Sequence, residues 1–278
     1  MLLPRFLTAV FGLPLILFTI WWGQIPFLVM VFGIVLLALY EYYNLAECAS
    51  LPVFKSVGLV CGGIFSLGIC FLGTSLAEEW GSPIRSVFLP LFLAFTLALF
   101  SFFNFFSRKK ENAFIALSLM WFGNFYVAWT LSHLYLLREM KPEGLYYTYF
   151  LFFVIWALDI GAYLGGIRFG RRRLSEYISP KKTWEGAVVG SVTALGAATL
   201  CKVSFSNFLN LTQTLILATV IILVAQVSDL SESLFKRNVG VKDSGNLLPG
   251  HGGILDRFDS FLLTTPLYYY LLVFFLNK

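Results

Sequence analysis

The sequence predicts an all-α polytopic membrane protein, and three observations support this prediction. Of the 278 residues, 58% are hydrophobic and only 13% are charged, which is far too apolar for a soluble domain of this length. Apolar runs near the length that crosses a ~30 Å hydrocarbon core recur along the chain, with short polar breaks between them. Four cysteines are scattered through apolar segments without metal-binding spacing. We therefore exclude a soluble enzyme and expect neither a zinc site nor a disulfide framework.

The apolar runs predict about nine transmembrane helices. The first run follows Arg5 but lacks a small-residue cleavage pattern, and the next run begins within a few residues. We therefore interpret the first run as a membrane helix rather than a signal peptide. The predicted helices span residues 6–23, 27–46, 56–76, 86–106, 113–137, 145–167, 185–203, 211–230 and 259–276.

The charge of the connecting loops predicts the orientation of the bundle. If the N-terminus is cytoplasmic, fifteen of the twenty lysines and arginines fall in cytoplasmic segments. The outer segments then keep only Arg85, Arg138, Lys141, Lys202 and Lys278. Cytoplasmic loops of membrane proteins carry an excess of cations. We expect a cytoplasmic N-terminus, and an odd number of helices then places the C-terminus outside.

The chain divides into two predicted regions. Residues 1–144 contain no aspartate and have short connections, which indicates a scaffold of transmembrane helices. Residues 145–278 contain all five aspartates and two long polar loops on the predicted cytoplasmic side, at 168–185 and 229–259. We expect this second region to be catalytic. No internal repeat is evident, so the inverted-repeat architecture of many secondary transporters has no support.

Residues 229–259 hold the densest group of charges in the chain. If the preceding helix continues past Asp229, then Asp229, Glu232 or Ser233, and Lys236 lie on one stripe at three- and four-residue steps. Asp256 and Asp259 would share a face at the start of the last helix, near an N-terminus that favours anions. Facing aspartates of this kind could hold a divalent cation.

The segment between these two helices is rich in glycine, with Gly245, Gly250, Gly252 and Gly253. Such positions let backbone amides approach a ligand without interference from side chains. Oxygen ligands from few carboxylates, completed by phosphate and water, suit Mg²⁺ better than zinc, since the chain has two histidines and no cysteine pair. The pattern predicts a site for Mg²⁺ and a polyphosphate.

The string SLFKRNVGVKDSGNLLPGHGGILDRFD, Ser233 to Asp259, resembles the signature of phosphatidate cytidylyltransferases, the CDP-diacylglycerol synthases. It follows the family pattern of S-x-hydrophobic-K-R, four residues, K-D-x-small and then P-x-H-G-G-hydrophobic-x-D-R-hydrophobic-D without departure. Asp159, Ala162-Tyr163 and the string SPKKTWEG from Ser179 to Gly186 resemble the preceding family region. About fifteen fixed or near-fixed positions must coincide for this match, which makes it a specific signal.

The resemblance implies Mg²⁺-dependent conversion of CTP and phosphatidic acid to CDP-diacylglycerol and pyrophosphate. By motif position, Asp229 and Asp256 would bind the metal and act in catalysis. The further residues expected to be catalytic are Lys236, Arg237 and Lys242. The residues expected to bind substrate are Asp159, Lys181, Lys182, Ser233, His251, Gly252, Gly253, Arg257 and Asp259.

Two other classes compete with this interpretation. A CTP-dependent polyprenol or diacylglycerol kinase would share charged cytoplasmic loops but would attack the γ-phosphorus. A transporter would need broken helices in corresponding halves, whereas polar groups gather at one end here. We expect a lipid bilayer as partner, no nucleic acid, and a bacterial inner (plasma) membrane as the location. The N-terminal helices could also form a homodimer contact.

Overall fold

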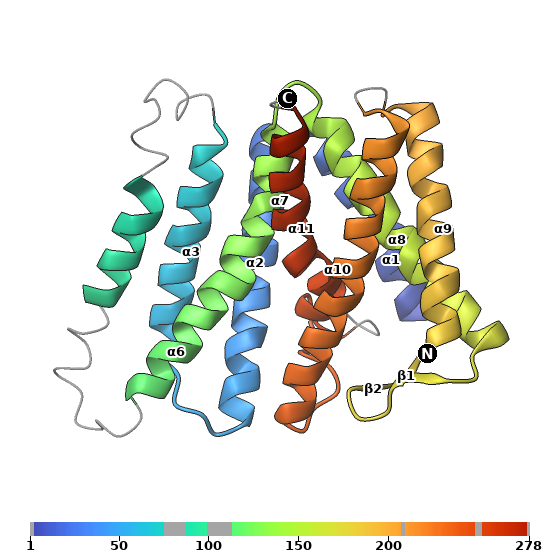
Figure 1. The fold of residues 1–278 in the computed structure, drawn as a ribbon. Helices are drawn as coiled ribbons and strands as arrows, with labels where there is room; N and C mark the ends of the chain where they lie inside the picture. The colour runs from blue at the N-terminus through green and yellow to red at the C-terminus, as the bar shows by residue number, and fades with distance from the viewer. Residues whose placement is uncertain (1–2, 75–86, 99–112, 207–208, 248–251, 277–278) are drawn as a thin grey trace.

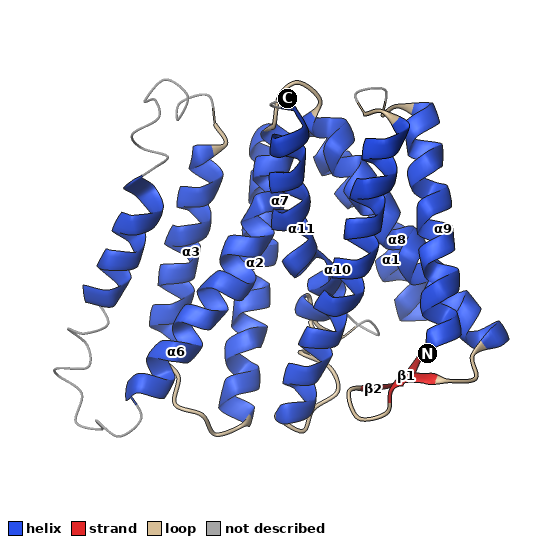
Figure 2. Cartoon of the chain, in the orientation of Figure 1, coloured by secondary structure: helices blue, strands red, loops and turns tan. Residues whose placement is uncertain are grey.

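The computed structural model describes residues 3–74, 87–98, 113–206, 209–247 and 252–276. Almost all of these residues are helical, and the strands form a single small hairpin (Figure 2). The elements are α1 (Leu3–Trp22), α2 (Gln24–Cys48), α3 (Lys55–Leu72), α6 (Ala113–Gly123), the π-helix η2 (Asn124–Trp129), α7 (Thr130–Glu139), α8 (Gly144–Phe169), β1 (Arg173–Ser175), β2 (Ser179–Thr183), α9 (Trp184–Ser204), α10 (Leu211–Asn238) and α11 (Leu255–Leu276).

Seven of the described segments are long and apolar enough to cross a membrane. They are Gln24–Cys48, Lys55–Leu72, Ala113–Glu139, Gly144–Phe169, Trp184–Ser204, Leu211–Asn238 and Leu255–Leu276. Two shorter apolar helices, Val10–Trp22 and Val87–Ala98, lie where the first and fourth predicted helices were expected. The helical membrane fold is confirmed at this level. Part of the expected helix 86–106 lies outside the described residues.

The helices stand side by side in one bundle (Figure 1). α3 and α6 lie at one side and α9 at the other, with α2, α7 and α11 between them, and α10 packs on both α11 and α9. α1 begins at the end that carries the β-hairpin, whereas α11 finishes at the opposite end. The connection between α2 and α3 also lies at the hairpin end. The end of α10 lies at the same end of the bundle as the hairpin.

α8 and α9 pack closely because small residues face each other at their contact. A Cβ added at Gly190 would lie 2.7 Å from the carbonyl oxygen of Leu158, and one at Gly161 would lie 3.0 Å from the Cα of Gly190. Small residues let helix backbones approach within a membrane, where apolar burial gives little driving force. This contact fixes α8, which carries Asp159, beside the start of α9.

The span from Ala113 to Glu139 is interrupted by the six-residue π-helix η2. Such insertions widen the helix locally and often mark functional sites. Asn124 and Tyr126 of η2 are both buried, and the Tyr43 hydroxyl lies 3.4 Å from Asn124 Oδ1. η2 packs against α2, α3 and α11, so it connects the two predicted regions.

The structure corrects the predicted ends of two helices and adds a hairpin that was not predicted. α10 does not stop at residue 230 but continues to Asn238, and α11 begins at Leu255 rather than 259. The expected loop 229–259 is therefore shortened to residues 239–254. The expected loop 168–185 contains an antiparallel hairpin, β1 with β2, that the all-helical prediction missed. Five predicted site residues that lie between the predicted helices 211–230 and 259–276 have helical geometry: Ser233, Lys236, Arg237, Asp256 and Arg257.

Candidate active site

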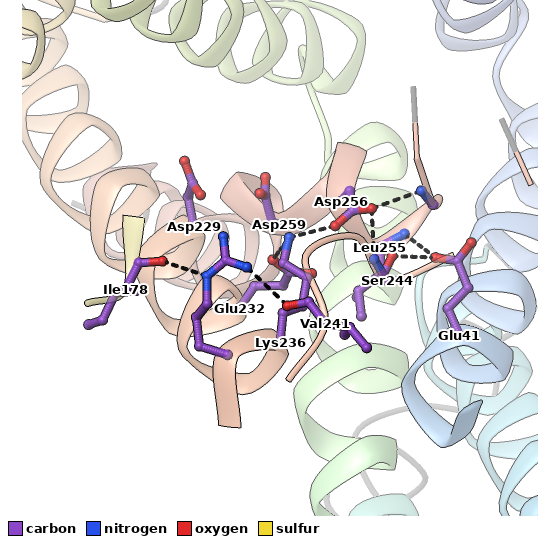
Figure 3. A network of polar contacts seen from close by, with 12 residues as sticks. Glu41, Ile178, Asp229, Glu232, Lys236, Val241, Ser244, Leu255, Asp256 and Asp259 are labelled. Atoms are coloured by element: carbon purple, nitrogen blue, oxygen red, sulfur yellow. Dashed lines mark hydrogen bonds and ion pairs between the residues drawn. The ribbon is translucent and has the colours of Figure 1, made fainter. Parts of the chain in front are cut away.

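A buried ionic cluster joins α10 to α11. The Lys236 ammonium lies 2.5 Å from Glu232 Oε2 on the same helix and 2.5 Å from Asp256 Oδ1 on α11 (Figure 3). Glu232 and Lys236 are only 1% and 8% exposed. Charges removed from water in this way are costly unless they are paired. The stripe predicted along an extended α10 is confirmed for Glu232 and Lys236.

Asp256 also organises the segment that enters α11. Its Oδ2 accepts hydrogen bonds from the backbone N–H groups of Ser244 at 2.9 Å and Gly253 at 2.8 Å. Gly252 has a φ of +81°, which favours glycine. A Cβ at Gly252 would also lie 2.7 Å from Asp256 Oδ2. Both oxygens of Asp256 are therefore engaged by its own chain.

A second group of carboxylates lies beside this cluster. Asp259 interacts electrostatically with Asp229 and Asp159, and Figure 3 shows the side chains of Asp229 and Asp259 projecting to the same side. Asp229 forms an ion pair with Lys182, and Arg257 contributes positive charge near Asp159. Three helices, α8, α10 and α11, thus contribute three acidic side chains that interact electrostatically with one another. Like charges gathered at this depth require cations to balance them.

The β-hairpin delivers Lys182 to this acidic group. Arg237, near the end of α10, holds the hairpin because its Nε donates to the Ile178 carbonyl at 3.2 Å and its Nη1 donates to the Val241 carbonyl at 3.0 Å. At the other side, the Thr183 hydroxyl caps α9 by accepting the Gly186 N–H at 3.1 Å. The hairpin is therefore tied to two helices, and its second strand points a lysine at Asp229.

The predicted site residues have different outcomes. The structure brings together Asp159, Lys182, Asp229, Lys236, Asp256, Arg257 and Asp259. Lys181 and Lys242 are exposed, and Ser233 is partly buried. Arg237 donates to two backbone carbonyls. Gly252 and Gly253 flank the Asp256 carboxylate. His251 lies outside the described residues. The catalytic and binding roles assigned to these residues stay predictions.

Three residues of the site were not among the predicted site residues. Glu232 completes the Lys236 cluster. Tyr126 of η2 interacts electrostatically with Glu232, Asp259 and Asp229, and its buried hydroxyl has no hydrogen-bond partner among the described residues. Glu41 of α2 contacts the segment that enters α11. A carboxylate inside the apolar run 27–46 was a signal available in the sequence, because charge at membrane depth usually has a function.

The donor chemistry of the site fits Mg²⁺ held partly by the protein. Among the described residues, no three acidic, histidine or cysteine side chains converge to enclose a metal ion. The donors present are carboxylate oxygens, and neither oxygen of buried Glu232 accepts a hydrogen bond of ordinary geometry from a described residue. Mg²⁺ commonly uses one or two carboxylates and fills its shell with water and substrate phosphate. The site fits an ion that arrives with a nucleotide.

The chain has the fold of a helical integral membrane protein with a charged site at one end, and its sequence places it in a known class. The cytidylyltransferase family profile matches residues 3–275. The chain therefore belongs to the cytidylyltransferase family and is a nucleotidyltransferase enzyme.

Individual relatives extend this match over the whole length. A phosphatidate cytidylyltransferase of Bacillus subtilis (strain 168) is 34% identical over 279 residues, covering 98% of this chain and 97% of that protein. A phosphatidate cytidylyltransferase of Staphylococcus saprophyticus is 35% identical over 273 residues, covering 97% of this chain and 98% of that protein. One from Staphylococcus aureus (strain COL) is 46% identical over 137 residues, which is 49% of this chain and 52% of that protein. The resemblance seen in the motifs is thus confirmed by full-length relatives.

Proposed function

We propose that this enzyme transfers the cytidylyl group of CTP to phosphatidic acid, giving CDP-diacylglycerol and pyrophosphate. A phosphate oxygen of phosphatidic acid attacks the α-phosphorus of CTP in line. The bond from that phosphorus to the oxygen bridging to the β-phosphorus breaks, and pyrophosphate leaves with the bonding electrons. Catalysis of this kind rests on positioning and on neutralising charge. No covalent intermediate on the protein is required.

One observation supports this function above the others. Lys236 is held between two carboxylates in a buried cluster, and Lys182 is held against Asp229 beside it. Lys182 is on β2, and Lys236 lies in the last turn of α10. A site with both fixed cations and fixed carboxylates can receive a polyphosphate together with its metal ion. Lys236 and Asp256 lie in the string that resembles the family signature, and Lys182 lies in the string SPKKTWEG.

The proposal assigns Mg²⁺ to Asp229 and Asp256, and the bound ion would neutralise charge on the phosphate oxygens. Among the protein's own groups, the cations would neutralise the triphosphate: Lys182, Lys236, Arg237, Lys242 and Arg257. Asp159 and Lys181 would form the opposite wall of the pocket. The remaining residues assigned to substrate binding are Ser233, His251, Gly252, Gly253 and Asp259. The contacts already made by Lys182 and Lys236 keep these cations at the site and pre-oriented.

The membrane topology can be stated more finely, as a number of crossings and an orientation. We propose nine membrane crossings, a cytoplasmic N-terminus and a location in the bacterial inner membrane. The hairpin end of the bundle supports the orientation, because residues 171–182 carry five cations and because Lys55 directly follows the connection between α2 and α3, which lies at the same end. Reporter fusions after α3 and after α9 would test the orientation, and a cytoplasmic signal from either fusion would reverse it.

Self-association stays a prediction, to be tested by light scattering in detergent.

The position of the transferred label tests the reaction. Purified protein in mixed micelles is supplied with phosphatidic acid, Mg²⁺ and CTP labelled at the α- or the γ-phosphate. We expect α-label in the lipid and γ-label in pyrophosphate. Label from the γ-position in the lipid would replace the proposal with a CTP-dependent lipid kinase. Absence of both from folded protein would remove cytidylyl transfer as the function.

A further inference from the structure

Glu41 lies on α2, far along the chain from the charged segment, yet it contacts that segment directly. Its side chain is buried, with 1% of the residue exposed. One carboxylate oxygen accepts the Ile254 N–H at 3.0 Å, and the other accepts the Leu255 N–H at 2.8 Å and the Ser244 hydroxyl at 2.9 Å. Figure 3 shows Glu41 approaching the network from a helix on the opposite side to α10.

These three hydrogen bonds hold the two backbone segments that contact Asp256, which are the start of α11 and the backbone at Ser244. Ile254 and Leu255 immediately precede Asp256, and the first amides of a helix have no partner within the helix. A carboxylate at this position satisfies them and interacts favourably with the helix dipole. Ser244 belongs to the second segment, and its own N–H donates to Asp256 Oδ2. One side chain from α2 therefore holds the two segments between which Asp256 is placed.

Two glycines of the segment are required by the closeness of Glu41. A Cβ at Gly245 would lie 2.7 Å from Glu41 Oε1. A Cβ at Gly253 would overlap both Glu41 Oε2 and the Ser244 hydroxyl. Real Cβ atoms do not approach neighbours so closely, so the segment can wrap the carboxylate only because both positions lack side chains. The local backbone is therefore built around Glu41.

We infer that Glu41 is a positioning residue of the active site, acting through Ser244 and the start of α11 to orient Asp256. Asp256 in turn contacts the Lys236 ammonium, so the effect of Glu41 reaches the cation of the buried cluster. The hydrogen bonds that Glu41 accepts come from Ser244, Ile254 and Leu255, and none of these is a proposed catalytic cation. This inference rests on the cytidylyl transfer proposed above. It differs from a general stabilising role because it predicts a local change in residues 244–247 and 252–256 and none in distant helices.

The test compares Glu41→Gln with Glu47→Gln, a matched control on the same helix. Glu47 pairs with Lys55 at the surface, and 48% of its side chain is exposed. We expect E41Q to lower kcat by about 10- to 100-fold, as loss of a supporting hydrogen-bond partner typically does, with KM for phosphatidic acid close to that of the parent. Hydrogen exchange should accelerate in peptides covering 244–247 and 252–256 and stay unchanged in α3 and α9. E47Q should match the parent in both measurements.

Several results would overturn the inference. Parent-like kcat and exchange in E41Q would remove any role for Glu41, and faster exchange throughout the protein would reduce the role to general stability. If E41Q does not fold, Ser244→Ala decides, because it removes only one of the three donors; parent-like kcat and local exchange in S244A would then reject the inference. The exchange measurement needs no substrate. A parent protein that lacks cytidylyl transfer would therefore refute the proposed function while leaving Glu41 testable.

Discussion

The two regions of the bundle satisfy their buried polar groups in different ways. In the first region, neutral groups pair with one another, as where the hydroxyl oxygens of Ser66 and Ser132 lie 2.7 Å apart between α3 and α7. The second region also buries charged groups, and Lys236 is shared there by Glu232 and Asp256. A neutral hydrogen bond is cheap to bury, whereas each buried ion costs several kcal/mol before its partner is counted. The difference indicates stability in the first region and chemistry in the second.

Glu41 is an exception to this contrast, because it is a buried carboxylate of the first region. It brings a carboxylate from the first region to the segment that enters α11. α11 also packs against α7 and α2. The charged network is therefore supported by helices on both sides. The following variants test whether charge in the second region and neutral packing in the first have separate consequences.

The largest effect is expected from removing the shared cation. Lys236→Met leaves buried Glu232 without its ion partner, which should lower the free energy of unfolding by about 3–5 kcal/mol and abolish turnover. Adding Glu232→Gln should recover most of the stability but no activity, because Glu232 then carries no uncompensated charge and Asp256 keeps its two backbone N–H donors. Thermal unfolding in detergent and the labelled-CTP assay measure the two effects. Recovery of turnover in the double variant would show that Lys236 serves only to neutralise Glu232.

Asp229→Asn should lower kcat by about 100- to 1000-fold, the range seen when one preorganised electrostatic group is removed from an active site. The side chain keeps its size, so the unfolding temperature should change little. Glu176→Gln is the control, since Glu176 is an exposed acidic residue in the turn of the hairpin. Dependence on Mg²⁺ concentration should shift in D229N alone. Near-parent kcat with an unchanged Mg²⁺ dependence would remove Asp229 from the metal site.

Arg237→Lys should lower kcat by about tenfold, because the loss of roughly one hydrogen bond's free energy at the site corresponds to that factor. A lysine keeps the charge but cannot reach both the Ile178 and Val241 carbonyls with a planar fork. The hairpin would then hold Lys182 less firmly. Arg173→Lys, on exposed β1, should behave as the parent protein does. Equal kcat in both variants would show that the guanidinium geometry is not needed.

Much of the helical fold could be predicted from the sequence because membrane thickness imposes a length on each apolar run. The predicted helix 145–167 is observed as Gly144–Phe169 and the predicted 185–203 as Trp184–Ser204. The β-hairpin could not be predicted this way. Its strands are short and polar, and Arg237 and the cap at Thr183 hold it in place. Such contacts come from distant parts of the chain and leave no local periodicity.

The site was predictable where one helical face sets the contact and not where tertiary packing does. The spacing of Glu232 and Lys236 predicts their contact, since both lie on α10. The pairing of Lys182 with Asp229 depends on how the hairpin folds over α10. Glu41 is separated from Leu255 by more than half of the chain. Only its position as a carboxylate within an apolar run indicated that it was unusual.

The smallest effect is expected from the neutral pair in the first region. Ser66→Ala should lower the free energy of unfolding by about 1 kcal/mol, because it leaves the Ser132 hydroxyl without this partner. Ser132 still donates to the Ala128 carbonyl at 2.6 Å, which limits the cost. The double variant Ser66→Ala with Ser132→Ala should be only slightly less stable than Ser66→Ala alone, since the pair is already broken and only the hydrogen bond from Ser132 to the Ala128 carbonyl is lost in addition. Both variants should keep the parent kcat in the labelled-CTP assay once folded protein is counted. A fall in kcat that exceeds the loss of folded protein would mean that α3 and α7 transmit their packing to the site, and the contrast between the two regions would then fail.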